Sequence, residues 1–171
     1  MDKNFIKKII SDISCPQDAD EIHWLVDKVE KINPKVILEI GLEKGGSFKI
    51  WEAMAGEGSL MIGVDAQIKN VISFGPHAHL VEGFSQERST IDRVKEILNG
   101  RQVDFLFIDG GHDLPTVTSD YNNYSPMVRS GGMIGFHDIN DGAGVRQFWH
   151  NVPGNKEDIT YQIGIGLIRK D

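Results

Sequence analysis

The chain alternates between short runs of apolar residues and longer segments in which apolar positions recur at helical spacing. Such runs are typical of strands buried on both faces, as in a parallel sheet whose two sides are covered by helices. We predict five such strands, at Val36–Ile40, Leu60–Val64, His79–Val81, Val103–Ile108 and Gly132–Phe136. The segments between and after them predict helices over Ser47–Ala55, Glu87–Leu98, Pro115–Val128 and Val145–His150.

Two further helices are predicted before the first strand, and an edge structure after the last. Apolar residues recur at helical spacing from Phe5 to Ile13 and from Ile22 to Ile32, and a proline follows each segment. The C-terminal segment ITYQIGIGLIRK is rich in β-branched residues and predicts either an antiparallel hairpin or one bent edge strand. The whole pattern predicts an α/β fold with a mostly parallel sheet, helices on both faces and an antiparallel C-terminal edge.

Composition narrows the class of protein. A chain of 171 residues is expected to form one domain. Its net charge of −7 argues against a general nucleic-acid binder, which needs a basic surface. The sequence has no apolar run of about 20 residues, so no membrane partner is expected. With a single cysteine, Cys15, we expect a cytoplasmic protein in which that thiol serves packing or lies on the surface, away from the motifs below.

Polar and glycine residues follow each predicted strand. In an open parallel sheet, ligands bind at the carboxyl ends of the strands, near the point where the strand order reverses. These ends carry, in chain order, EIGLEKGGS from Glu39, then Asp65, then EGFSQ from Glu82, then Asp109 with His112, and finally His137 with Asp138. Asp and Gly are also common turn residues, so any one of these ends alone is equally consistent with a turn. Five together indicate a site along one edge of the sheet.

The first turn and the second strand end favour a nucleoside-containing cofactor. Gly41, Gly45 and Gly46 permit a tight turn with close backbone approach, and Ser47 can cap the following helix. Their spacing differs from the dinucleotide fingerprint G-x-G-x-x-G, and no phosphate-binding G-x-x-x-x-G-K-[ST] motif is present. An acid such as Asp65 can accept both hydroxyl hydrogens of a ribose and would repel a 2′-phosphate.

Five stretches, taken together, resemble the class I S-adenosylmethionine-dependent methyltransferases: VILEIGLEKGGS, MIGVDA, VEGFSQE, FLFIDGGHD and GGMIGFHDI. More narrowly, they are similar to the metal-dependent O-methyltransferases, which include catechol O-methyltransferase and a bacterial group of sugar O-methyltransferases and cephalosporin-hydroxylase-like proteins. The resemblance covers Val36 to Ile139 and the GIGLI ending. It implies a Rossmann-like sheet of seven strands or a shortened version, in one domain with a helical cap over 1–33 and a cofactor-binding core over 34–171.

The resemblance implies a cofactor, S-adenosyl-L-methionine, and the residues that hold it. Those residues are Glu39, Gly41, Gly45, Ser47, Asp65, Ser85, Gln86 and Asp109. Within this set, Ser47 is implied to hold the methionine carboxylate and Asp65 the ribose hydroxyls. Ser85 and Gln86 match a Ser-Gln pair at the adenine.

A divalent-metal site is implied as well, with departures from the family pattern. Asp109 and Asp138 match two metal-binding carboxylates, but Ile139 stands where the catechol enzymes have an asparagine ligand. His137 stands where the sugar-modifying group has a glutamate, which makes it a candidate third ligand. Two carboxylates and waters suffice for Mg²⁺, whereas a histidine ligand shifts the preference toward Mn²⁺, iron or zinc.

His112 and Asp109 are the predicted catalytic residues. His112 occupies the place of the catalytic lysine of the catechol enzymes, and histidine is usual there in the sugar group. A histidine can take a hydroxyl proton at neutral pH. The alternative is that His112 merely caps the helix that begins near Pro115. We expect Asp113 to cap that helix rather than to join the chemistry.

We therefore expect methyl transfer from S-adenosylmethionine to the hydroxyl oxygen of a small molecule or sugar, with Mg²⁺ or Mn²⁺ as a candidate cofactor. The short cap leaves either an open site or one that a second subunit completes, so a homodimer is a candidate assembly. Three alternatives remain: a cofactor-binding module without catalysis, methyl transfer to nitrogen on the same fold, and a nicotinamide-dependent oxidoreductase, which the glycine spacing disfavours.

Overall fold

Seven strands form one sheet in the order β3-β2-β1-β4-β5-β7-β6 in the computed structural model, which describes residues 1–171. The strands are β1 Val36–Ile40, β2 Leu60–Asp65, β3 Ala78–Glu82, β4 Val103–Ile108, β5 Val128–His137, β6 Asn155–Ile159 and β7 Ile165–Arg169. The pairs from β3 to β5 are parallel, whereas β7 runs antiparallel to both β5 and β6. The predicted α/β class, with a mostly parallel sheet and an antiparallel C-terminal edge, is confirmed. The strand order reverses between β1 and β4.

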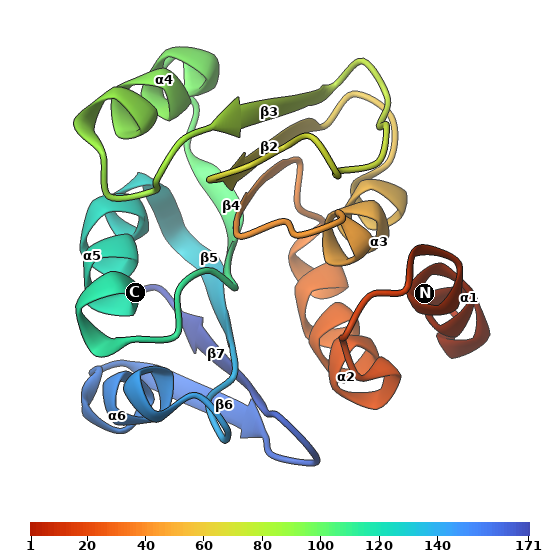
Figure 1. Cartoon of the computed structure of the whole chain (residues 1–171), viewed down its shortest axis with the longest axis vertical. Coiled ribbons are helices and arrows are strands. Elements are labelled where there is room, and N and C mark those ends of the chain that lie inside the picture. Colours follow the sequence, from red (N-terminus) through yellow and green to blue (C-terminus); the bar gives the residue numbers. More distant parts are fainter.

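Helices cover both faces of the sheet, as Figure 1 shows. One face carries α1 (Lys3–Ile13), α2 (Ala19–Val29) and α3 (Gly46–Ala55); the other carries α4 (Arg88–Leu98), α5 (Leu114–Tyr124) and α6 (Ala143–Asn151). None of these helices is both long and apolar enough to cross a lipid bilayer. Because α3, α4 and α5 each follow a parallel strand, they begin at the edge of the sheet where those strands end.

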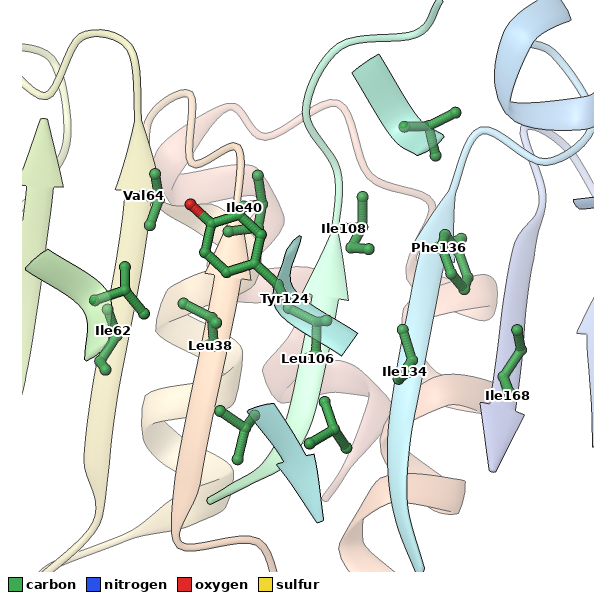
Figure 2. Close-up of a cluster of buried hydrophobic side chains, with 14 of the residues drawn as sticks. Leu38, Ile40, Ile62, Val64, Leu106, Ile108, Tyr124, Ile134, Phe136 and Ile168 are labelled. Atoms are coloured by element: carbon green, nitrogen blue, oxygen red, sulfur yellow. The ribbon is translucent and has the colours of Figure 1, made fainter. Parts of the chain in front are cut away.

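Successive side chains of the central strands point to opposite faces of the sheet, and this alternation divides the core into two layers. Leu38 and Ile40 of β1 point to the face covered by α4, α5 and α6, where Tyr124 lies across the neighbouring strands (Figure 2). Ile37 points to the opposite face, into the cluster that contains Trp51. There the Trp51 ring packs edge-on against two aromatic rings of β4. Burial on both faces explains why these strands are apolar throughout.

The helix predicted over Pro115–Val128 is shorter than expected. It ends at Tyr124, a 3₁₀ turn follows over Ser125–Met127, and β5 begins at Val128 rather than at Gly132. Pro126 explains the break, because proline has no N–H to donate within a helix and disfavours helical backbone in the residue before it.

The C-terminal edge is an antiparallel hairpin, and the alternative of one bent strand is wrong. Its first strand, β6, lies at Asn155–Ile159 and therefore precedes most of the segment that predicted it. β6 is an edge strand with mostly exposed polar side chains, so it lacks the apolar pattern by which a strand is detected.

Candidate functional site

A cavity of about 760 Å³ opens at the carboxyl ends of the parallel strands, beside the β1–β4 switch point. This is where an open α/β sheet binds its ligands, and the volume suits a molecule of nucleoside size. Nine residues predicted from the sequence line it: Gly41, Ser47, Asp65, Ser85, Gln86, Asp109, His112, His137 and Asp138. The structure thus brings together strand ends that are up to about a hundred residues apart in the chain.

Glu39 and Gly45, two of the predicted cofactor residues, do not line the cavity. Glu39 is fully buried in β1 beneath it and accepts a hydrogen bond from the Ser47 hydroxyl. Burial raises the pKa of Glu39 well above its usual range, although the bond from Ser47 opposes the shift. Gly45 is the N-cap residue of α3, so the expectation that Ser47 caps this helix is wrong.

Gly41 is required by the close approach of two chain segments. Its φ is +88°, and a Cβ atom built there would lie 2.1 Å from the backbone oxygen of Asp109. A side chain at position 41 would therefore separate the β1–α3 loop from the end of β4. The glycine brings the two central strand ends of the cavity together.

Asp65 fixes the loop that follows β1. Its Oδ2 accepts hydrogen bonds from the backbone N–H groups of Leu42 (2.7 Å) and Glu43 (3.0 Å), and its Oδ1 accepts one from Gln67 (2.9 Å). A carboxylate offers about four lone-pair positions, which leaves one on Oδ1 for a ligand.

The loop after β3 carries Ser85 and Gln86, and α5 supports it from behind. The Tyr124 hydroxyl donates to the Ser85 carbonyl at 2.8 Å, and Gln86 Nε2 lies 3.5 Å from Asp120 Oδ1. Asp120 is fully buried, and burial raises its pKa to about 6. No motif marks Asp120 in the sequence, because a single acid within a helix has no pattern of its own.

Asp109, His137 and Asp138 form a compact cluster at the ends of β4 and β5. His137 Nδ1 lies 3.1 Å from Asp109 Oδ1 and 3.2 Å from Asp138 Oδ2, and one ligand atom from each residue falls within 4.8 Å of the other two. Asp138 adopts a left-handed backbone conformation with a φ of 62°, which is uncommon for a residue with a side chain. This conformation lets His137, the last residue of β5, and Asp138, directly after it, serve the same cluster.

The charges of the cluster shift its proton equilibria. Burial alone would lower the pKa of His137, but Asp109 and then Asp138 raise it to about 10. Burial raises the pKa of Asp138, yet its hydrogen bond to His137 and the charges of His137 and His112 bring it below its usual range. The donor set fits a divalent cation in number and spacing, provided that the cation displaces the proton from His137 Nδ1.

His112 lies at the rim of the cavity, with 63% of its side chain exposed. Its Nε2 is 2.8 Å from Asp138 Oδ2, so it joins the cluster instead of capping α5. Asp113 caps that helix, as predicted, by accepting a hydrogen bond from the Thr116 N–H at 3.0 Å.

Three residues of the cavity wall had no signal in the sequence analysis. Cys15 and Gln17 come from the connection between α1 and α2, and Ile163 comes from the loop between β6 and β7. Cys15 therefore lies in the wall of the site, contrary to the expectation that it is remote from the motifs. Gln17 Nε2 donates a hydrogen bond to Asp109 Oδ2 at 2.6 Å.

Fold and cavity together define the class I methyltransferase architecture, and a comparison with protein families agrees. A family model described as a methyltransferase domain matches residues 38–139. The chain belongs to this methyltransferase-domain family, and its sheet has the Rossmann-like form of the class I S-adenosylmethionine-dependent enzymes.

Two curated relatives share only part of their length with this chain. The uncharacterized protein R132 of Acanthamoeba polyphaga mimivirus is 30% identical over 115 residues, which cover 61% of this chain and 51% of that protein. The uncharacterized protein y4gI of Sinorhizobium fredii is 24% identical over 166 residues, which cover 85% of this chain and 18% of that protein. The chain thus spans about half of the first relative and less than a fifth of the second.

Solved structures with the same fold include several O-methyltransferases. A Staphylococcus aureus protein assigned as a caffeoyl-CoA O-methyltransferase superposes with a TM-score of 0.72 at 16% identity, covering 98% of this chain and 91% of that one. The O-methyltransferase from Bacillus cereus, solved with S-adenosylhomocysteine, superposes with a TM-score of 0.66 at 18% identity, covering 98% of this chain and 90% of that one. MycE of mycinamycin biosynthesis was solved with magnesium, S-adenosylhomocysteine and mycinamycin VI. It superposes with a TM-score of 0.71 at 15% identity, covering 96% of this chain and 54% of that one. At these identities the likeness concerns the fold.

Proposed function

We propose that this protein transfers a methyl group from S-adenosylmethionine to a hydroxyl oxygen of a small molecule, with sugars among the candidate acceptors. One observation carries the proposal. The cavity at the switch point combines an acid with a free lone-pair position, Asp65, and a histidine, His112, held against the Asp138 carboxylate at the end of β5. The methyl donor would use Asp65 to hold its ribose, and the acceptor hydroxyl would use His112 to take its proton.

The residues of the first two strand ends would bind the donor. Asp65 keeps one free lone-pair position on Oδ1, so we expect it to accept a hydrogen bond from one ribose hydroxyl rather than from both. The backbone N–H groups at the N-terminus of α3 would supply partners for the carboxylate of the amino-acid portion, and the Ser47 hydroxyl would join them by turning its single hydrogen away from Glu39. Ser85 and Gln86, supported by α5, would face the adenine.

His112 would take the proton of the acceptor hydroxyl. With Nε2–H donating to Asp138, the lone pair on Nδ1 is the one that accepts a proton. The acceptor oxygen then forms a bond to the methyl carbon while the carbon–sulfur bond breaks, leaving a methyl ether and S-adenosylhomocysteine. Alignment of donor and acceptor in the cavity supplies the remaining rate enhancement.

A divalent cation, if bound, would be held by Asp109, Asp138 and His137 Nδ1 and would favour ionisation of the acceptor hydroxyl. Without it, protonated His137 offsets one of the two carboxylate charges.

The direct test measures methyl transfer from isotopically labelled S-adenosylmethionine to a panel of catechols, phenols and sugars, with and without Mg²⁺ or Mn²⁺. We expect His112→Ala to lower turnover by about 10²-fold or more while S-adenosylhomocysteine binding stays within about twofold. Asp109→Ala should also remove most turnover. His150→Ala, at an exposed position on α6, serves as the matched control.

Two outcomes would contradict the proposal. Full activity of His112→Ala would remove the assigned proton acceptor. Donor binding without transfer to any acceptor, under all metal conditions, would favour a cofactor-binding module without catalysis.

A further inference from the structure

Gln17 places an unpaired polar atom in the wall of the cavity. The side chain follows Pro16 in the connection between α1 and α2, and the residue is 8% exposed. Its Nε2 is occupied by the 2.6 Å hydrogen bond to Asp109, whereas its Oε1 is buried and has no partner. A buried carbonyl oxygen without a donor is costly, which indicates that a ligand supplies the donor.

The chemistry of Asp109 fixes the orientation of this carboxamide. An ionised carboxylate only accepts hydrogen bonds, so the amide group that faces it must be the donating nitrogen. The oxygen is then necessarily the atom left for a ligand.

The charges around the α1–α2 connection select a cationic donor. The Cys15 thiol, two residues before Gln17, lies in the electrostatic field of the Asp109 and Glu43 carboxylates. A positively charged N–H group is therefore favoured in this corner of the cavity over a neutral or anionic one.

The position beside α3 narrows the choice further. A Cβ atom built on Gly46 would lie 2.5 Å from Cys15 Sγ, so the connection packs against the first turn of α3. A helix N-terminus attracts a carboxylate, and in an α-amino acid the ammonium group is one carbon away from the carboxylate. A carboxylate at the start of α3 would bring that ammonium group toward Gln17 and Asp109.

We propose that Gln17 Oε1 binds the α-ammonium group of the amino-acid portion of the methyl donor, while Nε2 positions the Asp109 carboxylate. The inference rests on the proposed function. It gives the helical segment before the sheet a part in donor selection, because this residue recognises a group that the adenosine half of the donor lacks.

The test is calorimetric and compares two ligands on two proteins. The ligands are S-adenosylhomocysteine and its analogue without the α-amino group; the proteins are the wild type and Gln17→Met, a change of similar volume that removes both polar atoms. We expect the wild type to prefer S-adenosylhomocysteine by about tenfold or more, and Gln17→Met to lose most of that preference. Gln147→Met, exposed on α6, should keep it.

The outcomes separate this inference from the proposed function. If the wild type binds neither ligand, the proposed function fails. If it binds both and Gln17→Met retains the full preference, the role of Gln17 is overturned. The role of Gln17 is also overturned if Gln17→Met keeps the preference but binds Mn²⁺ more weakly, because the carboxamide would then support a metal site. Should Gln17→Met fail to fold, a crystal structure of the wild type with S-adenosylhomocysteine decides: a nitrogen about 3 Å from Oε1 supports the proposal, and a nitrogen elsewhere overturns it.

Discussion

At the scale of single residues, the site places ionisable side chains where burial and neighbouring charge compete. His137 is stabilised in its charged form by Asp109 at 3.1 Å and then by Asp138 at 3.2 Å, and His137 in turn stabilises the charged form of Asp138. At Asp120 burial dominates and favours the neutral form; the charge of Asp113 acts in the same direction, and a hydrogen bond from Ser85 opposes it. The pKa values of two aspartates, one in the cavity wall and one behind it, are thus shifted in opposite directions.

The raised pKa of Asp120 predicts a pH-dependent contribution to stability. Its folded pKa of about 6 lies above the ordinary value of 3.8, so the folded chain holds this proton more tightly than the unfolded chain. The stabilisation is complete below about pH 4 and is lost as the pH rises through 6. Asp120→Asn removes this titration. The free energy of unfolding of the variant minus that of the wild type should therefore increase by up to about 3 kcal/mol as the pH rises from about 4 to about 7.5.

Urea denaturation of both proteins across this pH range measures the difference. Asp141→Asn, at an exposed position, controls for the loss of a negative charge. If the difference in the free energy of unfolding between Asp120→Asn and the wild type stays constant with pH, the raised pKa of Asp120 is contradicted.

Sequence patterns predicted the strand-end residues because parallel strands end at one edge. Knowing that Asp65, Asp109 and Asp138 each follow an apolar run is sufficient to place them together. Gln17 and Cys15 could not be found in this way, because they lie in a connection between helices with no periodicity or motif. Their proximity to Asp109 depends on how α1 and α2 pack, and that packing is a tertiary property.

At the scale of elements, α2 holds the loop between β6 and β7 against the site. Glu21, fully buried at the start of α2, accepts hydrogen bonds from the backbone N–H groups of Gln162 (2.7 Å) and Gly164 (3.0 Å). Between these two residues lies Ile163, which lines the cavity. One carboxylate therefore connects the N-terminal helices to the C-terminal hairpin.

Glu21→Ala should loosen this loop. The substitution leaves two backbone N–H groups without their partner, which is expected to cost about 2–4 kcal/mol in the free energy of unfolding. Amide hydrogen exchange at Gln162 and Gly164 should accelerate. Glu21→Gln, which keeps an acceptor oxygen, should restore most of the protection, and Asp27→Ala, exposed on the same helix, should leave it unchanged. If amide exchange at Gln162 and Gly164 is unchanged in Glu21→Ala, the Glu21 carboxylate does not hold the loop.

Element boundaries were predictable where one physical signal dominates. Burial on both faces marks β1, β2, β4 and most of β5, and α5 begins where Asp113 and Pro115 place it. The end of α5 and the position of β6 were wrong, since Pro126 acts within an apparently continuous pattern and an exposed edge strand has little apolar periodicity.

At the scale of the whole molecule, a sheet with helices on both faces supplies a rigid edge, and connections distant in sequence complete the cavity there. The two core layers fix the strands, so the side chains at their ends keep their relative positions. The proposed donor-binding residues Asp65, Ser85 and Gln86 lie toward β2 and β3, and the proposed proton acceptor, His112, lies against Asp138 at the end of β5. Methyl transfer would need two adjacent subsites of this kind, which hold the donor methyl group in line with the acceptor oxygen.

A crystal structure of the protein with S-adenosylhomocysteine and Mn²⁺ tests the central claim most directly. We predict the nucleoside in the cavity at the strand ends, with one ribose hydroxyl on Asp65 Oδ1 and the sulfur facing the side of His112. An empty cavity at saturating ligand, or a nucleoside bound with its ribose away from Asp65, would contradict the account.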